Sequence, residues 1–378
     1  MNNNDEFHIK VDPRILKILS ENLYTNIYYV IAELIANAYD ADAHNVHLEI
    51  FNDFIAIEDD GNGMTREQID GYLNVGLESR TDESNSFTKS GRRKMGRKGV
   101  GKLAALSISS QYSLMTKNSN DYYGFIVKKD IDEFGRLDSI QVDQKSFKFN
   151  KLHQNGTRIE IYNCTVNIHK DIEIVAKNIL KIFPVISENF KIHIHYNDKI
   201  KILDNYDNEI ISQLATITII GDDYKKLKKH FNTDNSKFIY REVPEIVSDV
   251  FNIVTKDGQN VKRTINIKGW IGSYITTRGR SKIISDFPDN HISIFANGKL
   301  GEFNILPIIT TTRMTEQYIV GNLYIDIFEE SILPDMSLSN RQGYNTNDIR
   351  YIKAMEKAKE LLQQALNLHD QYIIMKDE

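Results

Sequence analysis

The feature that most constrains the fold is a set of three short polar motifs within the first 102 residues of the 378-residue chain. They are ELIANAYDA at residues 33–41, IEDDGNGM at residues 57–64, and GRKGVGK at residues 96–102. Each places small residues beside a carboxylate, an amide or a lysine, and glycine lets the backbone approach a ligand closely. A fold that brings the three segments together would build a polar ligand site in the N-terminal part of the chain.

The third motif comes close to a P-loop but lacks part of its chemistry. Gly96, Gly101 and Lys102 match the pattern G-x-x-x-x-G-K-[ST], whereas Leu103 stands where a hydroxyl must ligate Mg²⁺. The preceding residues 88–95 are basic and polar, so they do not form the buried strand that a P-loop follows. Glycines that open a helix still suit an anion. Alone, the segment is equally compatible with a glycine-rich hinge.

The first motif places a carboxylate and an amide on one helix face. Glu33 and Asn37 are four residues apart in a stretch with helical apolar spacing. A carboxylate can polarise a water, and an amide oxygen can ligate Mg²⁺. On spacing alone, a solvated pair is the more common outcome.

The second motif lies where an alternating strand ends. Asp59 is the acid at this point, and Gly61 and Gly63 free the backbone that follows it. A tight turn explains the same composition and is favoured when the motif is taken alone.

Composition limits the class of protein. A net charge of −5 argues against a broadly basic surface, so any nucleic acid should contact a local patch. The single cysteine, Cys164, excludes an internal disulfide and fits a reducing compartment. The sequence shows neither an apolar signal region nor a run of about 20 apolar residues. We therefore expect a soluble cytoplasmic protein with no membrane partner.

Periodicity predicts the elements that carry the motifs. Residues 12–40 read as two helices broken near Thr25, and residues 46–52 and 54–61 read as a strand pair. A helix should start near Thr65, which could cap it. From about residue 191 the chain changes to many short strands with polar turns.

These patterns predict an α+β protein with three parts. We expect a first domain at residues 1–195, with a polar, glycine-containing lid at about residues 76–102. A β-rich second domain should occupy residues 196–345, and a charged amphipathic C-terminal helix should occupy residues 346–378.

Together the motifs are more specific than any one of them. The order E-x-x-x-N, D-x-G-x-G, G-x-x-G-x-G resembles the GHKL ATPase superfamily (Bergerat fold), which includes DNA gyrase B, the HSP90 chaperone class, histidine kinases and MutL. NAYDADA and the long lid are similar to MORC proteins and their prokaryotic relatives, and NGTRIEI at residues 155–161 matches the family strand that carries a threonine near adenine. The second half resembles the transducer-like (ribosomal S5-like) domain that follows such ATPases.

The resemblance implies roles for individual residues. Glu33 would be the general base, Asn37 would ligate Mg²⁺, and Asp59 would bind the adenine amino group with the help of Thr157. The remaining positions implied to bind ATP are Asp40, Gly61, Gly63, Met64, Ser79, Gly96, Gly99, Val100, Gly101 and Lys102.

In relatives, a basic residue of the second domain reaches the γ-phosphate and reports hydrolysis. Arg341 and Lys299 are the candidates here, and for each the plain alternative is a surface charge. Gly343 after Arg341 favours a tight exposed loop, which suits a sensor.

The function implied is an ATP-dependent switch. Mg-ATP would order the lid, promote association of two copies, and be hydrolysed slowly, since lid and domain motions usually limit such cycles. The partner implied is DNA or a DNA-acting effector protein, with anti-phage defence as the biological context. The alternatives are a chaperone-like ATPase that acts on protein clients and a non-hydrolysing ATP-sensing scaffold.

Overall fold

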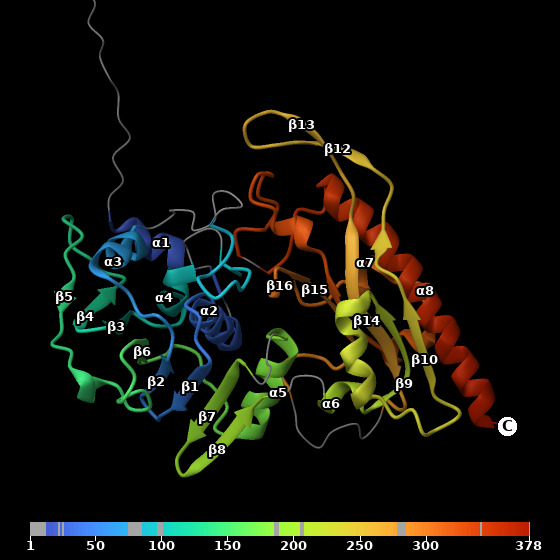
Figure 1. Ribbon diagram of the computed structural model, residues 1–378, viewed down its shortest axis with the longest axis horizontal. Coiled ribbons are helices and arrows are strands. Elements are labelled where there is room, and N and C mark those ends of the chain that lie inside the picture. Colours follow the sequence, from blue (N-terminus) through green and yellow to red (C-terminus); the bar gives the residue numbers. More distant parts are fainter. Residues whose placement is uncertain are drawn as a thin grey trace, which may run out of the picture.

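The protein has two lobes, each built on a β-sheet, which lie side by side (Figure 1). The computed structural model describes residues 13–21, 23–24, 26–74, 85–96, 101–184, 189–204, 208–277, 285–340 and 342–377. A long C-terminal helix, α8 (Ile349–Asp377), runs along the outer side of the second lobe. The expected α+β class is confirmed.

The first lobe contains a sheet with the strand order β5-β4-β3-β6-β2-β1-β7-β8, which counts eight strands within the described residues. Neighbouring strands are antiparallel except β1 and β7, which run parallel. The strands are β1 (Asn45–Ile50), β2 (Phe54–Asp59), β3 (Gln111–Asn118), β4 (Asp121–Lys128), β5 (Asp138–Ser139), β6 (Gly156–Tyr162), β7 (Lys191–Tyr196) and β8 (Lys199–Leu203).

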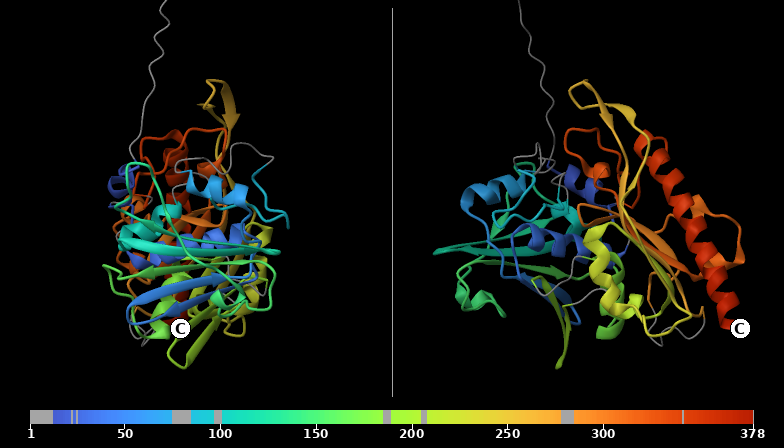
Figure 2. Two further views of the ribbon diagram at one scale, coloured as in Figure 1. Left: turned by 90° about the vertical axis from the view of Figure 1, so that its left-hand side faces the viewer. Right: turned by 45° about the vertical axis from the view of Figure 1, so that its right-hand side comes forward.

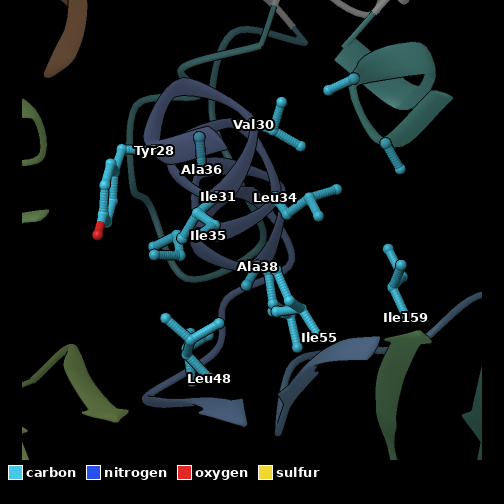
Figure 3. Close-up of a cluster of buried hydrophobic side chains, with 14 of the residues drawn as sticks. Tyr28, Val30, Ile31, Leu34, Ile35, Ala36, Ala38, Leu48, Ile55 and Ile159 are labelled. Atoms are coloured by element: carbon cyan, nitrogen blue, oxygen red, sulfur yellow. The ribbon is translucent and has the colours of Figure 1, made fainter. Parts of the chain in front are cut away.

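Helices cover one face of this sheet. They are α1 (Ile15–Glu21), α2 (Ile27–Asp40), α3 (Arg66–Leu73), α4 (Ala104–Ile108), which the 3₁₀ turn η1 (Gly101–Leu103) precedes, and α5 (Ile172–Ile182). A further 3₁₀ turn, η2 (Gln144–Ser146), lies between β5 and β6 in the chain. Helix α2 is the central one because most of its residues are buried. In Figure 3 its apolar side chains face Leu48, Ile55 and Ile159, which come from strands of the sheet.

The helix boundaries follow from capping chemistry that the sequence predicted in part. The break near Thr25 is confirmed, since Asn26 caps α2 by accepting from Tyr28 N. Thr65 caps α3 in a capping box, in which its side chain accepts from Gln68 N and Gln68 accepts from Thr65 N. Leu103 is buried at the start of the next helical segment, as expected for a residue that packs rather than ligates.

The second lobe is built on a mixed sheet with the strand order β10-β9-β14-β17-β15-β16, and β11 pairs with β14. The strands of this lobe are β9 (Leu214–Ile220), β10 (Ile239–Val243), β11 (Ile246–Val247), β12 (Phe251–Val254), β13 (Asn260–Arg263), β14 (Asn266–Tyr274), β15 (His291–Ala296), β16 (Lys299–Glu302) and β17 (Ile319–Tyr324). Strands β12 and β13 form a separate hairpin that projects from the lobe (Figure 2).

Helix α8 covers the second sheet, where it contacts β9 and β14. Its buried residues recur at helical spacing and include Ala354, Ala358, Leu361 and Ala365. The shorter helical segments of this lobe are α6 (Asn208–Ile211), η3 (Asp222–His230), α7 (Leu306–Ile309), η4 (Met314–Tyr318) and η5 (Asp326–Glu329).

A short segment before β15 attaches the second lobe to the first. Phe287 is buried, and its ring lies 5.6 Å from that of Tyr29 and 6.4 Å from that of Tyr28, both on α2. Lys181 of α5 donates to the carbonyl of Phe287 at 2.6 Å and to Asp289 at 2.6 Å. The segment is therefore held by aromatic packing on one helix and by a buried lysine on another.

The first sheet continues past residue 195, at which the sequence analysis placed the end of the first domain. Strand β8 pairs with β7 and ends at Leu203, and the next sheet begins with β9 at Leu214. The domain limits themselves stay a prediction. Among the described helices, none is both long and apolar enough to cross a membrane.

Substitutions at two isoleucines test the central position of α2. Ile35→Ala removes a fully buried side chain, so we expect a loss of about 2–5 kcal/mol in the free energy of unfolding. The matched control Ile18→Ala, on α1, changes a side chain that is 70% exposed and should stay within about 0.5 kcal/mol of wild type. Urea unfolding followed by circular dichroism measures both, and equal effects would contradict the packing described here.

Candidate active site

The floor of the site is a row of three polar side chains across neighbouring strands. Asp59 of β2 lies opposite Thr157 of β6, and Thr157 lies opposite Thr116 of β3. Residues directly opposite each other in antiparallel strands share one face of the sheet. Ile55 of β2 and Ile159 of β6 lie on this same face and pack against α2 (Figure 3), so the three side chains lie on the face that the helices cover.

Only one acid of the E-D-D sequence serves this face. Glu58 points to the other side of the sheet, is fully buried, and pairs with Arg158 at 2.8 Å. Asp60 accepts from the backbone N–H groups of His44 and Asn45 at 2.7 and 2.8 Å, which fixes the end of the strand. Strand alternation therefore leaves Asp59 as the acid that faces the helices.

Asp59 is buried, and Gly61 N donates to its Oδ1 at 2.9 Å. Burial is the largest influence on this carboxyl and raises its pKa to about 7, although the hydrogen bonds from Gly61 and Thr157 oppose the shift. Such a carboxyl changes its protonation state near neutral pH.

The glycine turn after Asp59 is fixed against β3. Gly63 has φ of 64°, and a Cβ atom there would lie 1.9 Å from the carbonyl oxygen of Lys117, so no other residue fits without a backbone shift. The next residue, Met64, donates its N–H to Thr116 Oγ1 at 2.9 Å. Gly61 thus contacts Asp59, Gly63 packs on β3, and the place of these two residues and Met64 in a base pocket stays a prediction.

The second part of the site lies on α2, where Glu33 is only 6% exposed. Its Oε2 accepts from Tyr24 Oη at 3.3 Å. Lys299 Nζ, from β16 of the second lobe, lies 2.7 Å from Oε2 and 2.9 Å from Oε1. A Cβ atom at Gly101 would lie 1.9 Å from Oε1, so the start of η1 contacts the carboxylate because Gly101 has no side chain.

Asn37 and Asp40 continue along the same helix with different environments. Asn37 is half-buried, and no residue within the described ranges hydrogen-bonds its side chain. Asp40 accepts from Met95 N and from Gly96 N, both at 2.8 Å. Burial raises the pKa of Asp40 to about 6 despite these bonds. Asp40 therefore holds the backbone of Met95 and Gly96, within the predicted lid, and in this conformation the Gly96 N–H is not available to a phosphate.

The structure thus brings most of the predicted residues to one region beneath and beside α2, and it adds two that the sequence analysis missed. Thr116 and Tyr24 were missed because a lone threonine in a strand and a lone tyrosine before a helix carry no motif. Four predicted residues lie outside the described ranges, as does the side chain of Lys102; the four are Ser79, Gly99, Val100 and Arg341. The roles of the individual residues stay predictions.

Comparison with known proteins identifies the first lobe. Residues 24–157 match the family described as histidine kinase-, DNA gyrase B-, and HSP90-like ATPase. They form a GHKL ATPase domain. This range contains Glu33 and Asn37 of α2 and reaches the strand position of Thr157. The superfamily resemblance expected from the motifs is confirmed.

Two relatives share more than the motifs. The chain is 30% identical over 354 residues to a putative type II restriction enzyme, HgiDII, of Herpetosiphon aurantiacus, and the match covers 91% of this chain and 53% of that protein. It is also 30% identical over 140 residues to ATPase morc-1 of Caenorhabditis elegans, which covers 35% of this chain and 15% of that protein. The chain therefore spans about half the length of the first relative and less of the second.

The pKa of Asp59 predicts a pH-dependent stability. The folded protein binds this proton more tightly than the unfolded chain, because the pKa rises from 3.8 to about 7 on folding. Wild-type stability should therefore fall as pH rises from about 4 to about 7 relative to Asp59→Asn, which is neutral in both states. Urea midpoints of the two proteins at pH 5 and pH 8 measure the difference. An Asp59→Asn advantage that shrinks with rising pH would contradict the burial of a titrating carboxyl.

Proposed function

We propose that the chain binds Mg-ATP and hydrolyses it slowly, and that this cycle switches the arrangement of its two lobes. The observation that carries the proposal is the contact between Lys299 and Glu33. It joins the second lobe directly to the predicted general base, through N–O distances of 2.7 and 2.9 Å. A lysine in contact with the Glu33 carboxylate is close enough to respond to a nucleotide that binds beside Glu33.

Glu33 has the surroundings that a water-activating carboxylate needs. It is nearly buried, which excludes bulk solvent, and Tyr24 holds one oxygen in place. Lys299 pairs with it here, so Glu33 would act as a base only once this cation is shared with, or moves to, a bound phosphate. This arrangement supports a slow and conformationally controlled hydrolysis.

Asn37 is the candidate Mg²⁺ ligand, because its side-chain amide is half-buried one helical turn beyond Glu33 and is not engaged by any described residue. Bound Mg²⁺ would neutralise charge on the ATP phosphates, and it commonly uses few protein ligands together with those phosphates. The base end of ATP would lie over Asp59 and Thr157, beside the turn that contains Met64.

Lid closure would act through Asp40. Asp40 lies on the same helix as Glu33, and its carboxylate accepts hydrogen bonds from the backbone of Met95 and Gly96, which belong to the predicted lid. Ordering of the lid around ATP would therefore shift α2 and, through Glu33, the contact with Lys299. Association of two copies in the ATP-bound state is part of the proposal.

The biological partner we propose is DNA or a DNA-acting effector, within an anti-phage or restriction system. The similarity to a putative restriction enzyme and to morc-1 supports this context. The chain spans 53% of the length of the first of these relatives, and so the effector activity is proposed to belong to a partner or to a further segment.

Turnover by Glu33→Gln tests the proposed base. Loss of general-base catalysis should lower ATP turnover by about 100-fold or more, whereas ATP affinity should remain within a few fold of wild type. A coupled phosphate-release assay with and without duplex DNA measures this, and DNA stimulation of wild type would support the proposed partner. Wild type that binds ATP without turning it over would instead support a binding-only switch.

Lys299→Met tests the link between the lobes. Of the nucleotide, Lys299 is proposed to contact only the terminal phosphate, which ADP lacks. We therefore expect turnover to fall about tenfold or more and ADP affinity to change by less than about twofold. The control is Lys268→Met, which removes an exposed ion pair to Asp223 at 3.1 Å in the same lobe. A loss of ADP affinity as large as the loss of turnover would show that Lys299 only stabilises the fold.

A further inference from the structure

Three segments of the site meet at the hydroxyl of Thr116. Met64 N lies 2.9 Å from Thr116 Oγ1 and donates to it. The carbonyl oxygen of Gly156 and the hydroxyl of Thr157 each lie 3.2 Å from the same oxygen. Thr116 is fully buried on β3, so these protein groups must supply the hydrogen bonds of its hydroxyl.

The proton positions follow from counting donors and acceptors. A threonine hydroxyl donates one proton and can accept two hydrogen bonds. The carbonyl of Gly156 can only accept, so its contact with Thr116 is a hydrogen bond only if the Thr116 hydroxyl donates its proton to it. The contact with Thr157 is then a hydrogen bond only if Thr157 donates. A single arrangement therefore satisfies all three contacts.

We infer that Thr116 is a positioning residue, which orients the Thr157 hydroxyl and thereby selects the base that binds beside Asp59. With its proton directed at Thr116, Thr157 can present only lone pairs to the pocket. An acceptor beside the Asp59 carboxylate matches an exocyclic amino group, as in adenine, and repels a carbonyl oxygen, as in hypoxanthine. The inference rests on the proposed function, because it takes Asp59 and Thr157 as the groups that contact the base.

The fixed orientation of Thr157 matters because Asp59 alone discriminates poorly. Burial raises the pKa of Asp59 to about 7, so near neutral pH the carboxyl is protonated in part of the molecules. A protonated carboxyl can donate to a base carbonyl as readily as a carboxylate accepts from an amino group. Selection against the base carbonyl therefore depends on Thr157, whose hydroxyl proton stays directed at Thr116 at every pH near neutrality.

The test compares the binding of ADP and IDP. At ring position 6 ADP carries an amino group and IDP a carbonyl, and the neighbouring N1 carries a proton only in IDP. Calorimetry on wild type, Thr116→Ser and Thr116→Val gives the ratio of the two affinities. Wild type should prefer ADP by about tenfold or more, and Thr116→Ser, which keeps the hydroxyl, should stay within about twofold of that ratio. Thr116→Val should lower the ratio by about fivefold or more, because the Thr157 hydroxyl is then free to turn and donate to the carbonyl.

The affinity ratio separates selection from a merely structural role. Equal weakening of ADP and IDP by Thr116→Val, or an unchanged ratio in a variant whose thermal unfolding matches wild type, would overturn the inference while leaving ATP binding intact. Wild type that binds neither nucleotide would overturn the proposed function and this inference together. A Thr116→Val protein that fails to fold leaves Thr116→Ser as the decisive variant, and loss of ADP preference in that variant would also overturn the inference.

Discussion

The burial of α2 against the first sheet is the constraint on which the rest of the structure depends. One stripe of the helix is apolar and packs on the strands, and this packing fixes the direction of every polar side chain on the remaining surface. Glu33 then contacts Gly101 and Lys299, and Asp40 contacts the backbone of Met95 and Gly96. A single helix thus carries the proposed chemistry and the contacts that report on it.

The pair formed by Glu33 and Lys299 is physically demanding. A nearly buried carboxylate loses hydration, and the lysine offsets that loss only while it stays in contact. Removal of one partner from a buried pair commonly costs about 3–5 kcal/mol, since the other charge is then unpaired. Movement of the second lobe away from α2 is therefore opposed until another charge near Glu33 compensates. This makes the arrangement of the lobes sensitive to the ionic content of the site.

The sequence predicted the parts of the fold that repeat a short pattern. The broken N-terminal helices, the first strand pair and the Thr65 cap all come from local periodicity and capping, which physical rules connect directly to residues. Lys299 could be named only as one of two candidates, because its contact with Glu33 joins segments that are distant in the chain. Thr116 gave no signal at all, since its importance comes from three neighbours that only the strand register brings together. The extension of the first sheet to β8 was missed for the same reason.

The attachment at Phe287 affects how the contact at Lys299 responds when the second lobe moves. Both contacts are made with α2, where Tyr28 and Tyr29 are separated from Glu33 by about 6–8 Å along the helix axis. With Phe287 held by aromatic packing and by Lys181, the second lobe is anchored on the helix that also carries the Lys299 contact. A rotation of the second lobe about this attachment would therefore move the nearby lysine much less than the far end of the lobe, with α8 and the β12–β13 hairpin.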